Sequence, residues 1–536
     1  MPVNKVKLKR REEDKASFST VSAPAQLPSL STHSFSFPAL DALLFFFFIN
    51  LTLQPLVEPD FGWHLRTGLD LLSHGWRMPL TDPYSHTVPE WPWVEHAWLT
   101  DGIVALIYSG LGSAGGLGVI LLFAAVITGA FVLSAATARA SRTARALSVA
   151  VVAWIALPFL GARIQMVTLL GLASVLWLWN RFQQGRVRTL WLFPPLFLLW
   201  ANVHGGFTAG LFTLGLLLAV TVLMRIIADR RPAWSERVDE PILTWRQIRH
   251  MAVIFGISVV VTLINPYGWR LYTEIVQSLG DRFMLDTLQE WQPVSLLHRA
   301  GRIYVVYVGG LALLMLCFYR RIEPTRWAVL GVFLALSLRH WRNVPFFLLV
   351  SIPLAADLMQ LAIAWMVKRV SIFRRHPIQW LFGVLVALAL GMAWLGADHL
   401  ERVALSGMEP EQFFASTEYP MQAVQWIREH RRELGTKLYN DYGLGGFLLW
   451  WLPNEKIFID GRMPAWRIGD RWIFYDYVAL TSWDPPALGV LAKYGVDWAI
   501  TATDGPLDRV LRGMHGWSIR YEDEKVRIFV KAADDQ

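Results

Sequence analysis

The sequence predicts a multi-pass α-helical membrane protein of about eleven transmembrane helices, followed by a small α/β domain outside the cytoplasm. Composition is the first observation, because 54% of the 536 residues are hydrophobic and only 17% are charged, unlike a typical soluble protein. The second is a series of long apolar windows, since a helix needs about 20 residues to cross the hydrocarbon core. The third is a change of pattern after residue 396, where short alternating segments replace these windows.

The apolar windows give the expected spans. They are Leu40–Val57, Leu117–Ala138, Ala146–Leu160, Ile164–Asn180, Thr189–Val203, Phe207–Ile227, Met251–Asn265, Tyr304–Tyr319, Trp327–Leu338, Val344–Ile363 and Ile378–Gly396. A shorter run, residues 97–111, would place the basic cluster ARASRTAR outside if it crossed the membrane. We therefore expect it to lie along the outer interface as a juxtamembrane helix.

The basic residues set the expected orientation. The formal net charge is +8, but the Lys and Arg residues cluster in short loops between apolar windows, which is typical of cytoplasmic loops and argues against nucleic-acid binding. Residues 1–38, with KVKLKRREEDK and a Ser/Thr/Pro stretch, read as a disordered basic cytoplasmic tail. The protein is thus expected in the cytoplasmic (inner) membrane among its lipids, with the C-terminal domain outside. The single cysteine, Cys317, excludes an internal disulfide.

The chain divides into a transmembrane domain, residues 39–396, with an outer loop at 58–96, and an extracytoplasmic α/β domain, residues 397–536. In the latter, VQWIREHRREL has the pattern of an amphipathic helix. KLYNDYGLGGFLLWWL, KIFIDGR, YGVDWAIT and RIFVKA have the pattern of strands. The Asp-Gly pair in KIFIDGR is most simply a tight turn, so Asp460 has a structural interpretation first.

This topology gathers polar residues on the outer face. Ionisable groups near lipid are costly, so they usually face a cavity and mark a site. The substrate-binding candidates are His64, Asp82, His96, Arg163, Gln165, Asn202, His204, Asn265, Arg339 and Arg342. Interfacial anchoring, head-group contact by arginines and helix-end hydrogen bonding are the competing structural interpretations.

Asp60 is the principal catalytic candidate, because it follows the first span by a few residues and lies one helical turn before His64 in DFGWHL. Transfer to a hydroxyl needs a carboxylate base, and the loop's tryptophans offer flat faces for sugar rings. The arginines supply donors that bind phosphate oxygens bidentately.

The order of EPDFGWHL, DPYS, WVEHAWL, ARIQ, WANVHGGF, NPYGW, YNDYGLGGFLLW and IFIDGR resembles the GT-C superfamily of membrane glycosyltransferases. That superfamily includes protein O-mannosyltransferases, lipid A aminoarabinose transferases and oligosaccharyltransferase catalytic subunits; the motifs are most similar to a bacterial branch. The resemblance implies a polyprenyl-phosphate-linked sugar donor. It also implies that Asp60 acts as base or metal ligand, with Glu95 as a second acidic residue, Asp82 in reserve, and Mg²⁺ or Mn²⁺ held by Asp60 and Glu95 where a cation is used.

The function predicted is therefore transfer of a sugar to a protein, lipid or glycan acceptor on the outer face of the membrane. Walker, GxGxxG, HExxH and GxSxG motifs are absent from the sequence, so ATP-driven, nicotinamide-dependent, zincin and serine-hydrolase chemistry lack motif support. One alternative is a lipid or polysaccharide transporter with an outer polar vestibule. Another is an assembly protein whose C-terminal domain binds partners.

Overall fold

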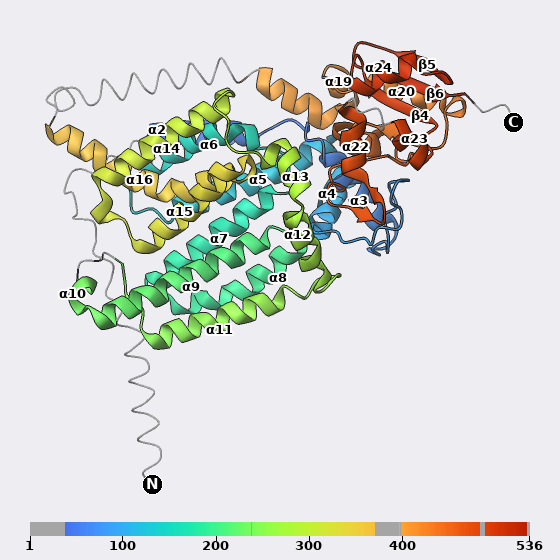
Figure 1. The fold of residues 1–536 in the computed structure, drawn as a ribbon. Coiled ribbons are helices and arrows are strands. Elements are labelled where there is room, and N and C mark those ends of the chain that lie inside the picture. The colour runs from blue at the N-terminus through green and yellow to red at the C-terminus, as the bar shows by residue number, and fades with distance from the viewer. Residues whose placement is uncertain are drawn as a thin grey trace, which may run out of the picture.

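The computed structural model describes residues 38–236, 238, 240–369, 396, 398–482 and 488–532. Long helices run side by side in one bundle, and a smaller mixed domain lies at one end of it (Figure 1). The expected tail, residues 1–38, falls almost wholly outside the described residues, and so does the expected span Ile378–Gly396.

The first part of the described chain is helical. Its helices are α2 (Pro38–Thr52), α3 (Phe61–Ser73), α4 (Trp98–Gly110), α5 (Gly115–Ala135), α6 (Arg142–Ala156), α7 (Met166–Gln183), α8 (Phe193–Val203), α9 (Phe207–Arg230), α10 (Pro232–Ser235), α11 (Trp245–Val261), α12 (Arg270–Gly280), α13 (Arg282–Thr287), α14 (Arg299–Cys317), α15 (Pro324–Arg339) and α16 (Val344–Arg369). Every apolar window that lies within the described residues coincides with helical structure.

The number of membrane spans is not confirmed. Among the described residues, 5 helical segments are long and apolar enough to cross a membrane: Gly112–Ala135, Arg142–Phe159, Phe207–Arg230, Arg299–Cys317 and Trp341–Met366. Helices α8 and α15 have 11 and 16 residues. At 1.5 Å per residue they reach about 17 and 24 Å, short of a hydrocarbon core about 30 Å thick.

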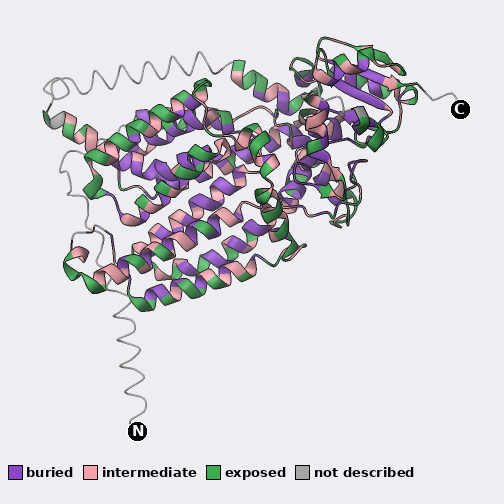
Figure 2. Cartoon of the chain, viewed as in Figure 1, coloured by how far each residue is buried: buried purple, intermediate pink, exposed green. Residues whose placement is uncertain are grey.

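The bundle helices bury one face against each other and leave apolar residues on the other. In α5, Val119, Phe123 and Ile127 are buried at helical spacing, whereas Leu121 and Val132 are about half exposed. Apolar side chains on both faces are the pattern of a helix that contacts lipid. Exposed residues follow the outer sides of the bundle helices in the same way (Figure 2).

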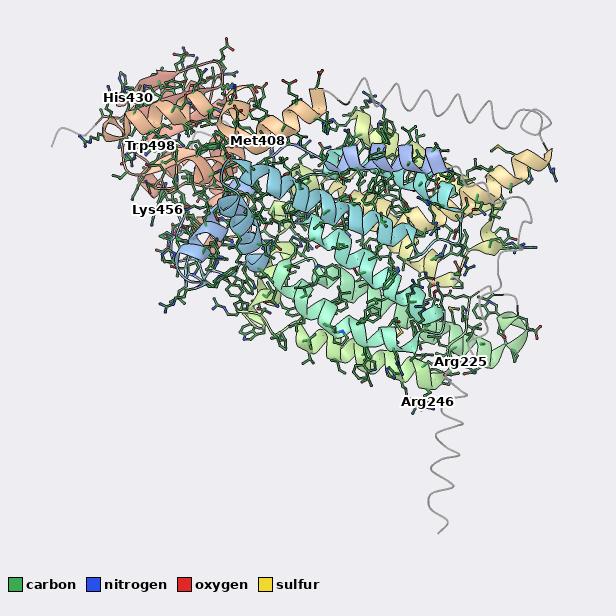
Figure 3. All side chains as sticks on the ribbon, turned by 180° about the vertical axis from the view of Figure 1, so that it is seen from behind. Arg225, Arg246, Met408, His430, Lys456 and Trp498 are labelled. Atoms are coloured by element: carbon green, nitrogen blue, oxygen red, sulfur yellow. The ribbon has the colours of Figure 1, made fainter. Side chains whose placement is uncertain are left out.

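The two ends of the bundle differ. Arg225 and Arg246, which flank the predicted cytoplasmic loop after α9, lie at the end far from the C-terminal domain, which carries Lys456 and Trp498 (Figure 3). The outer loop folds at the domain end, where α3 packs on α4 and on α21 (Gly445–Trp451). A Cβ placed on Gly62 of α3 would lie 2.0 Å from the carbonyl oxygen of Gly446, so backbone meets backbone there.

The C-terminal region is built on a four-stranded mixed sheet in the order β1-β4-β6-β5. Strand β1 runs parallel to β4, and β6 runs antiparallel to both β4 and β5. The strands are β1 (Leu438–Asn440), β2 (Arg467–Ile468), β3 (Arg471–Trp472), β4 (Trp498–Ala502), β5 (Trp517–Glu522) and β6 (Val526–Lys531). The helices besides α21 are α19 (Pro410–Ala415), α20 (Met421–Glu429), α22 (Ile473–Thr481), α23 (Leu488–Tyr494) and α24 (Pro506–Gly513).

Two of the predicted strands in this region are wrong. KLYNDYGLGGFLLWWL forms only the three-residue β1 before the chain turns into α21, because a short, fully buried apolar run has no periodicity that separates helix from strand. KIFIDGR makes a single bridge between Ile457 and Ser85 of the outer loop. The predicted helix VQWIREHRREL overlaps α20, and YGVDWAIT and RIFVKA overlap β4 and β6. The domain boundaries at 39–396 and 397–536 stay predictions.

Candidate functional site

A cavity of about 350 Å³ lies where α3, the segment before α4, the ends of several bundle helices and the C-terminal region meet. Eight of the predicted site residues line it: Asp60, His64, Glu95, His96, Arg163, Gln165, His204 and Arg342. Four do not line it: Asp82, Asn202, Asn265 and Arg339. The roles assigned to these residues stay predictions, but the fold brings most of them to one place from segments more than 280 residues apart.

Asp60 lies at the wall of this cavity, immediately before the first residue of α3. Its Oδ1 accepts a hydrogen bond from Trp63 Nε1 at 3.2 Å. A Cβ on Gly461 would lie 2.0 Å from the same oxygen, so the carboxylate rests directly on the backbone of the C-terminal region. Burial, with the nearby charges of Glu58 and Asp460, raises the pKa of Asp60 to about 7. A carboxylate with that pKa can exchange a proton near neutrality.

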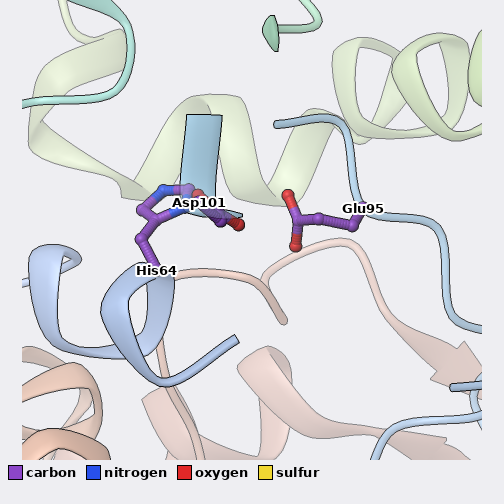
Figure 4. A group of neighbouring side chains, drawn as sticks. All are labelled: His64, Glu95 and Asp101. Atoms are coloured by element: carbon purple, nitrogen blue, oxygen red, sulfur yellow. Dashed lines mark hydrogen bonds and ion pairs between the residues drawn. The ribbon is translucent and has the colours of Figure 1, made fainter. Parts of the chain in front are cut away.

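His64, Glu95 and Asp101 form a compact cluster, defined here as the His64–Glu95–Asp101 cluster. All three side chains are buried, and one potential ligand atom from each lies within 4.8 Å of the others. His64 Nδ1 and Asp101 Oδ1 are 2.8 Å apart, and the Glu95 carboxylate points toward them from the loop (Figure 4). Burial raises the pKa of Glu95 and of Asp101 well above their ordinary values and lowers the pKa of His64 to about 3.

Sequence reasoning missed Asp101 because it was absorbed into the apolar run 97–111. The signal was nonetheless there: a lone aspartate in WLTDGIVALI sits in the first turn of a short apolar helix. A carboxylate in such a run is expensive to bury unless something binds it.

Two further histidines extend the cavity wall. The ring centroids of His96 and His204 are 5.4 Å apart. His204 Nδ1 accepts a hydrogen bond from the backbone N–H of Gly206 at 2.9 Å and lies 2.7 Å from Thr168 Oγ1. A Cβ on Gly206 would lie 2.1 Å from that hydroxyl. Gly206 of WANVHGGF therefore permits the expected close approach, whereas a Cβ on Gly205 would meet its nearest atom at 3.4 Å.

The cavity's arginines are already paired with carboxylates. Arg163 bonds to Glu58, and Arg342 bonds to Glu290 at 2.7 Å while stacking over Trp291 at 4.9 Å. Glu290 and Glu274 also line the cavity and were not among the sequence candidates, because each lies in a mixed polar segment rather than beside a span. Burial raises the pKa of Glu274 to about 7.

The remaining candidates do not line the cavity, and most of them form hydrogen bonds that give them structural roles. The Asp82 carboxylate accepts hydrogen bonds from the backbone N–H groups of Tyr84 and Ser85. It also forms an ion pair with Arg462 at 2.8 Å, which connects the outer loop to the C-terminal region. Asn265 accepts the N–H of Tyr267 two residues on, as in an Asx-turn.

Asn202 accepts a hydrogen bond from Trp98 Nε1 at 3.1 Å and donates to the carbonyl oxygens of Leu198 and Ile264. Arg339 is exposed at the end of α15. Of the candidate arginines Arg339 and Arg342, only Arg342 lines the cavity, because helix α15 ends between them.

Aromatic rings complete the wall. Trp91 and Trp466 are stacked, with ring centroids 5.3 Å apart and planes at 14°, and both line the cavity. The Arg462 guanidinium lies 5.4 Å from the Trp466 ring and 5.5 Å from that of Trp93. A flat aromatic face beside carboxylates is a surface on which a sugar ring packs.

No family model matches the chain, and no curated protein matches it in sequence. Solved structures do. Archaeal oligosaccharyltransferase AglB from Archaeoglobus fulgidus, in complex with an inhibitory peptide and a dolichol-phosphate, gives a TM-score of 0.53 at 11% identity over 93% of this chain and 74% of that one.

Two crystal structures of the oligosaccharyltransferase from the same organism give lower TM-scores. One, tethered with an acceptor peptide, gives 0.48 at 11% identity over 92% of this chain and 74% of that chain. The apo form gives 0.47 at 10% identity over 94% and 75%. At this identity the likeness of the first structure concerns the fold alone: the chain has a fold similar to that of the archaeal oligosaccharyltransferase.

Proposed function

We propose that the protein is a GT-C-type glycosyltransferase that moves a sugar from a polyprenyl-phosphate-linked donor to a protein, lipid or glycan acceptor on the outer face of the cytoplasmic membrane. The observation that carries this proposal is the position of Asp60. Its carboxylate, with a pKa of about 7, lies at a cavity that also holds arginines and stacked tryptophans, in the fold of a sugar-transferring enzyme.

The cavity has the groups that such a transfer needs. Asp60 is the base for the acceptor hydroxyl, because an ionised carboxylate there removes the proton as the new glycosidic bond forms. Trp466 and Trp91 provide the sugar-facing surface. Arg342 and Arg163 contact the departing phosphate when each replaces a hydrogen bond to its carboxylate partner with a hydrogen bond to a phosphate oxygen. The volume of about 350 Å³ falls in the range of small-molecule sites.

A divalent cation fits this chemistry, since it would neutralise charge on the donor phosphate. The sequence assigned the cation to Asp60 and Glu95, and both residues line the cavity. Among the described residues, however, Glu95 groups with His64 and Asp101 rather than with Asp60. The donor set that fits a cation is therefore the His64–Glu95–Asp101 cluster.

The interior of the bundle argues against the transporter alternative. A second cavity, of about 60 Å³, is lined by Arg139, Glu323 and Arg326 and shares none of its described lining residues with the first. Helix α7 reaches the first cavity with Thr168 and the second with Leu176. Between those positions it buries the apolar residues Leu169, Leu172, Ala173 and Val175. A polar path along this described helix is thus interrupted by an apolar layer.

The test is transfer of a labelled polyprenyl-phosphate sugar by the purified full-length protein in detergent. We expect Asp60→Asn to lower the rate at least 100-fold, because the amide cannot accept the proton. The matched control is Asp70→Asn: Asp70 lies on the same helix α3, pairs with Arg66 and accepts a hydrogen bond from Tyr84, and its side chain is not part of the cavity wall.

Detergent solution separates the two candidate functions, because a flippase needs two membrane sides and an enzyme does not. Equal transfer by wild type, Asp60→Asn and Glu95→Gln would remove Asp60 as the base. Movement of the lipid-linked sugar across vesicles, with no transfer under any acceptor condition, would favour the transporter.

A further inference from the structure

We infer that His64, Glu95 and Asp101 form a divalent-cation site in the cavity wall, with a preference for Mn²⁺ or Zn²⁺ over Mg²⁺. The site joins three separate segments: α3 supplies His64, the loop before α4 supplies Glu95, and the first turn of α4 supplies Asp101. The inference deepens the proposed function, but binding of the cation is measurable without any transfer reaction.

The spacing of the three side chains suits a cation. Metal–ligand bonds of about 2.1 Å put neighbouring ligands about 3 Å apart and opposite ligands about 4.2 Å apart. The 2.8 Å between His64 Nδ1 and Asp101 Oδ1 corresponds to neighbouring ligands. The outer limit of 4.8 Å across the group is close to the separation of opposite ligands, and the Glu95 carboxylate reaches in from a loop (Figure 4).

A second observation points to a ligand. Asp101 is fully buried, at 0% exposure, and its Oδ2 has no hydrogen-bond partner. Buried carboxylate oxygens are almost always satisfied, since leaving one without a donor costs the full desolvation free energy. A cation bound between Asp101, Glu95 and His64 would satisfy this oxygen with the ligand chemistry of the cluster.

The charge around the cluster also lacks a counterpart. The three arginines that line the cavity are committed to other carboxylates: Arg163 to Glu58, Arg342 to Glu290, and Arg462 to Asp82 and Asp460. In the part of the chain that the structure describes, the ion pairs of Glu95 and Asp101 are made with histidines and with no lysine or arginine. A bound cation would keep both carboxylates ionised, and beside a neutral imidazole their two negative charges would balance the charge of one divalent cation.

The ligand types indicate which cation is bound. Mg²⁺ prefers oxygen ligands and keeps several waters, whereas an imidazole suits transition metals such as Zn²⁺. One imidazole with two carboxylates is a donor set shared by Zn²⁺ and Mn²⁺. The site therefore discriminates against Mg²⁺ through His64.

The site also has an open side. His64 and Glu95 line the cavity, whereas Asp101 lies behind them and does not. A cation held by these three ligands keeps coordination positions that face the cavity, as in metal sites with a catalytic role. On the proposed function, a cation bound there would supply positive charge to the donor phosphate in addition to that of Arg163 and Arg342.

The experiment measures Mn²⁺ binding to the metal-depleted full-length protein in detergent, using electron paramagnetic resonance of free Mn²⁺. We expect one tight Mn²⁺ per chain, displaced by equimolar Zn²⁺ but only by at least a 100-fold excess of Mg²⁺. Asp101→Asn and Glu95→Gln should each weaken binding at least tenfold. Asp60→Asn and Glu274→Gln, which alter other carboxylates of the same cavity, should leave it within twofold.

A spectroscopic signature guards against variants that fail to fold. Electron spin-echo modulation of bound Mn²⁺ should contain an imidazole nitrogen coupling that His64→Gln removes while the variant stays monodisperse in gel filtration. Absence of a tight Mn²⁺, unchanged binding in Asp101→Asn, or loss of binding in Asp60→Asn would each overturn the site. Mn²⁺ binding that follows this pattern in a protein without transferase activity would uphold the site and refute the proposed function instead.

Discussion

Substitution of Gly461 by alanine tests whether the position of Asp60 sets the rate of transfer. The new Cβ would lie 2.0 Å from Asp60 Oδ1 and 2.8 Å from its Cγ. Non-bonded carbon and oxygen atoms need at least about 3 Å, so the carboxylate must move by about 1 Å or more. A displacement of that size in a reacting group costs about 100-fold in rate, which corresponds to about 2.7 kcal/mol in the activation barrier.

The clash falls on the end of a flexible side chain and not on backbone, so we expect Gly461→Ala to reduce kcat with little change in Tm. Gly443→Ala is the control, because a Cβ there meets no atom within 4 Å. The assay is initial-rate transfer of the labelled sugar with kcat and KM determined separately. In the double variant with Asp60→Asn, the rate should equal that of Asp60→Asn alone. A Gly461→Ala enzyme with the wild-type kcat would refute the reasoning.

Three further predictions concern the same region. Arg462→Gln leaves two buried carboxylates without their partner and should lower the free energy of unfolding by about 3–5 kcal/mol in thermal or denaturant unfolding in detergent; an unchanged midpoint would contradict this. Trp466→Ala removes one face of the stack with Trp91 and should raise the KM for the lipid-linked sugar about five- to tenfold, against a smaller change in kcat. The folded-state pKa of Glu274 is raised to about 7 from an ordinary 4.5, so stability is lost as pH rises from about 4.5 to about 7. Glu274→Gln should therefore raise Tm relative to wild type at pH 8 and match it at pH 4, and the opposite ranking would exclude a raised pKa.

The sequence was sufficient for the helical bundle because every apolar window is long enough for about three helical turns or more. It was insufficient for the number of spans, since composition does not say where a helix such as α15 ends. It was also insufficient for α21, where buried apolar residues follow one another without periodicity. Local pattern predicts elements, whereas length and burial depend on neighbours that only the fold supplies.

The same limit applies to the candidate site: local pattern predicted some of its residues and missed those defined by distant contacts. Asp60 was found because it follows the first window by a few residues and lies one helical turn before His64, and it does line the cavity. Asp101 was missed because it lies inside the apolar run 97–111, and its partner His64 is 37 residues away. Asp82 was a reasonable acidic candidate, but its partner Arg462 lies 380 residues further along the chain. The spacing of residues along the chain does not show contacts at such separations. A carboxylate that is paired with a distant arginine therefore cannot be told from an unpaired one by sequence alone.

The bond between Asp82 and Arg462 also limits how early during protein synthesis the cavity can form. The two residues are separated by 380 positions, and ribosomes add about 5–20 residues per second. Arg462 is therefore synthesised about 20–80 s after Asp82, and the bond between them cannot form before then. Throughout that interval Asp60 lacks the Gly461 backbone on which it rests. A chain interrupted before Arg462 can carry every bundle helix and still have an unformed cavity.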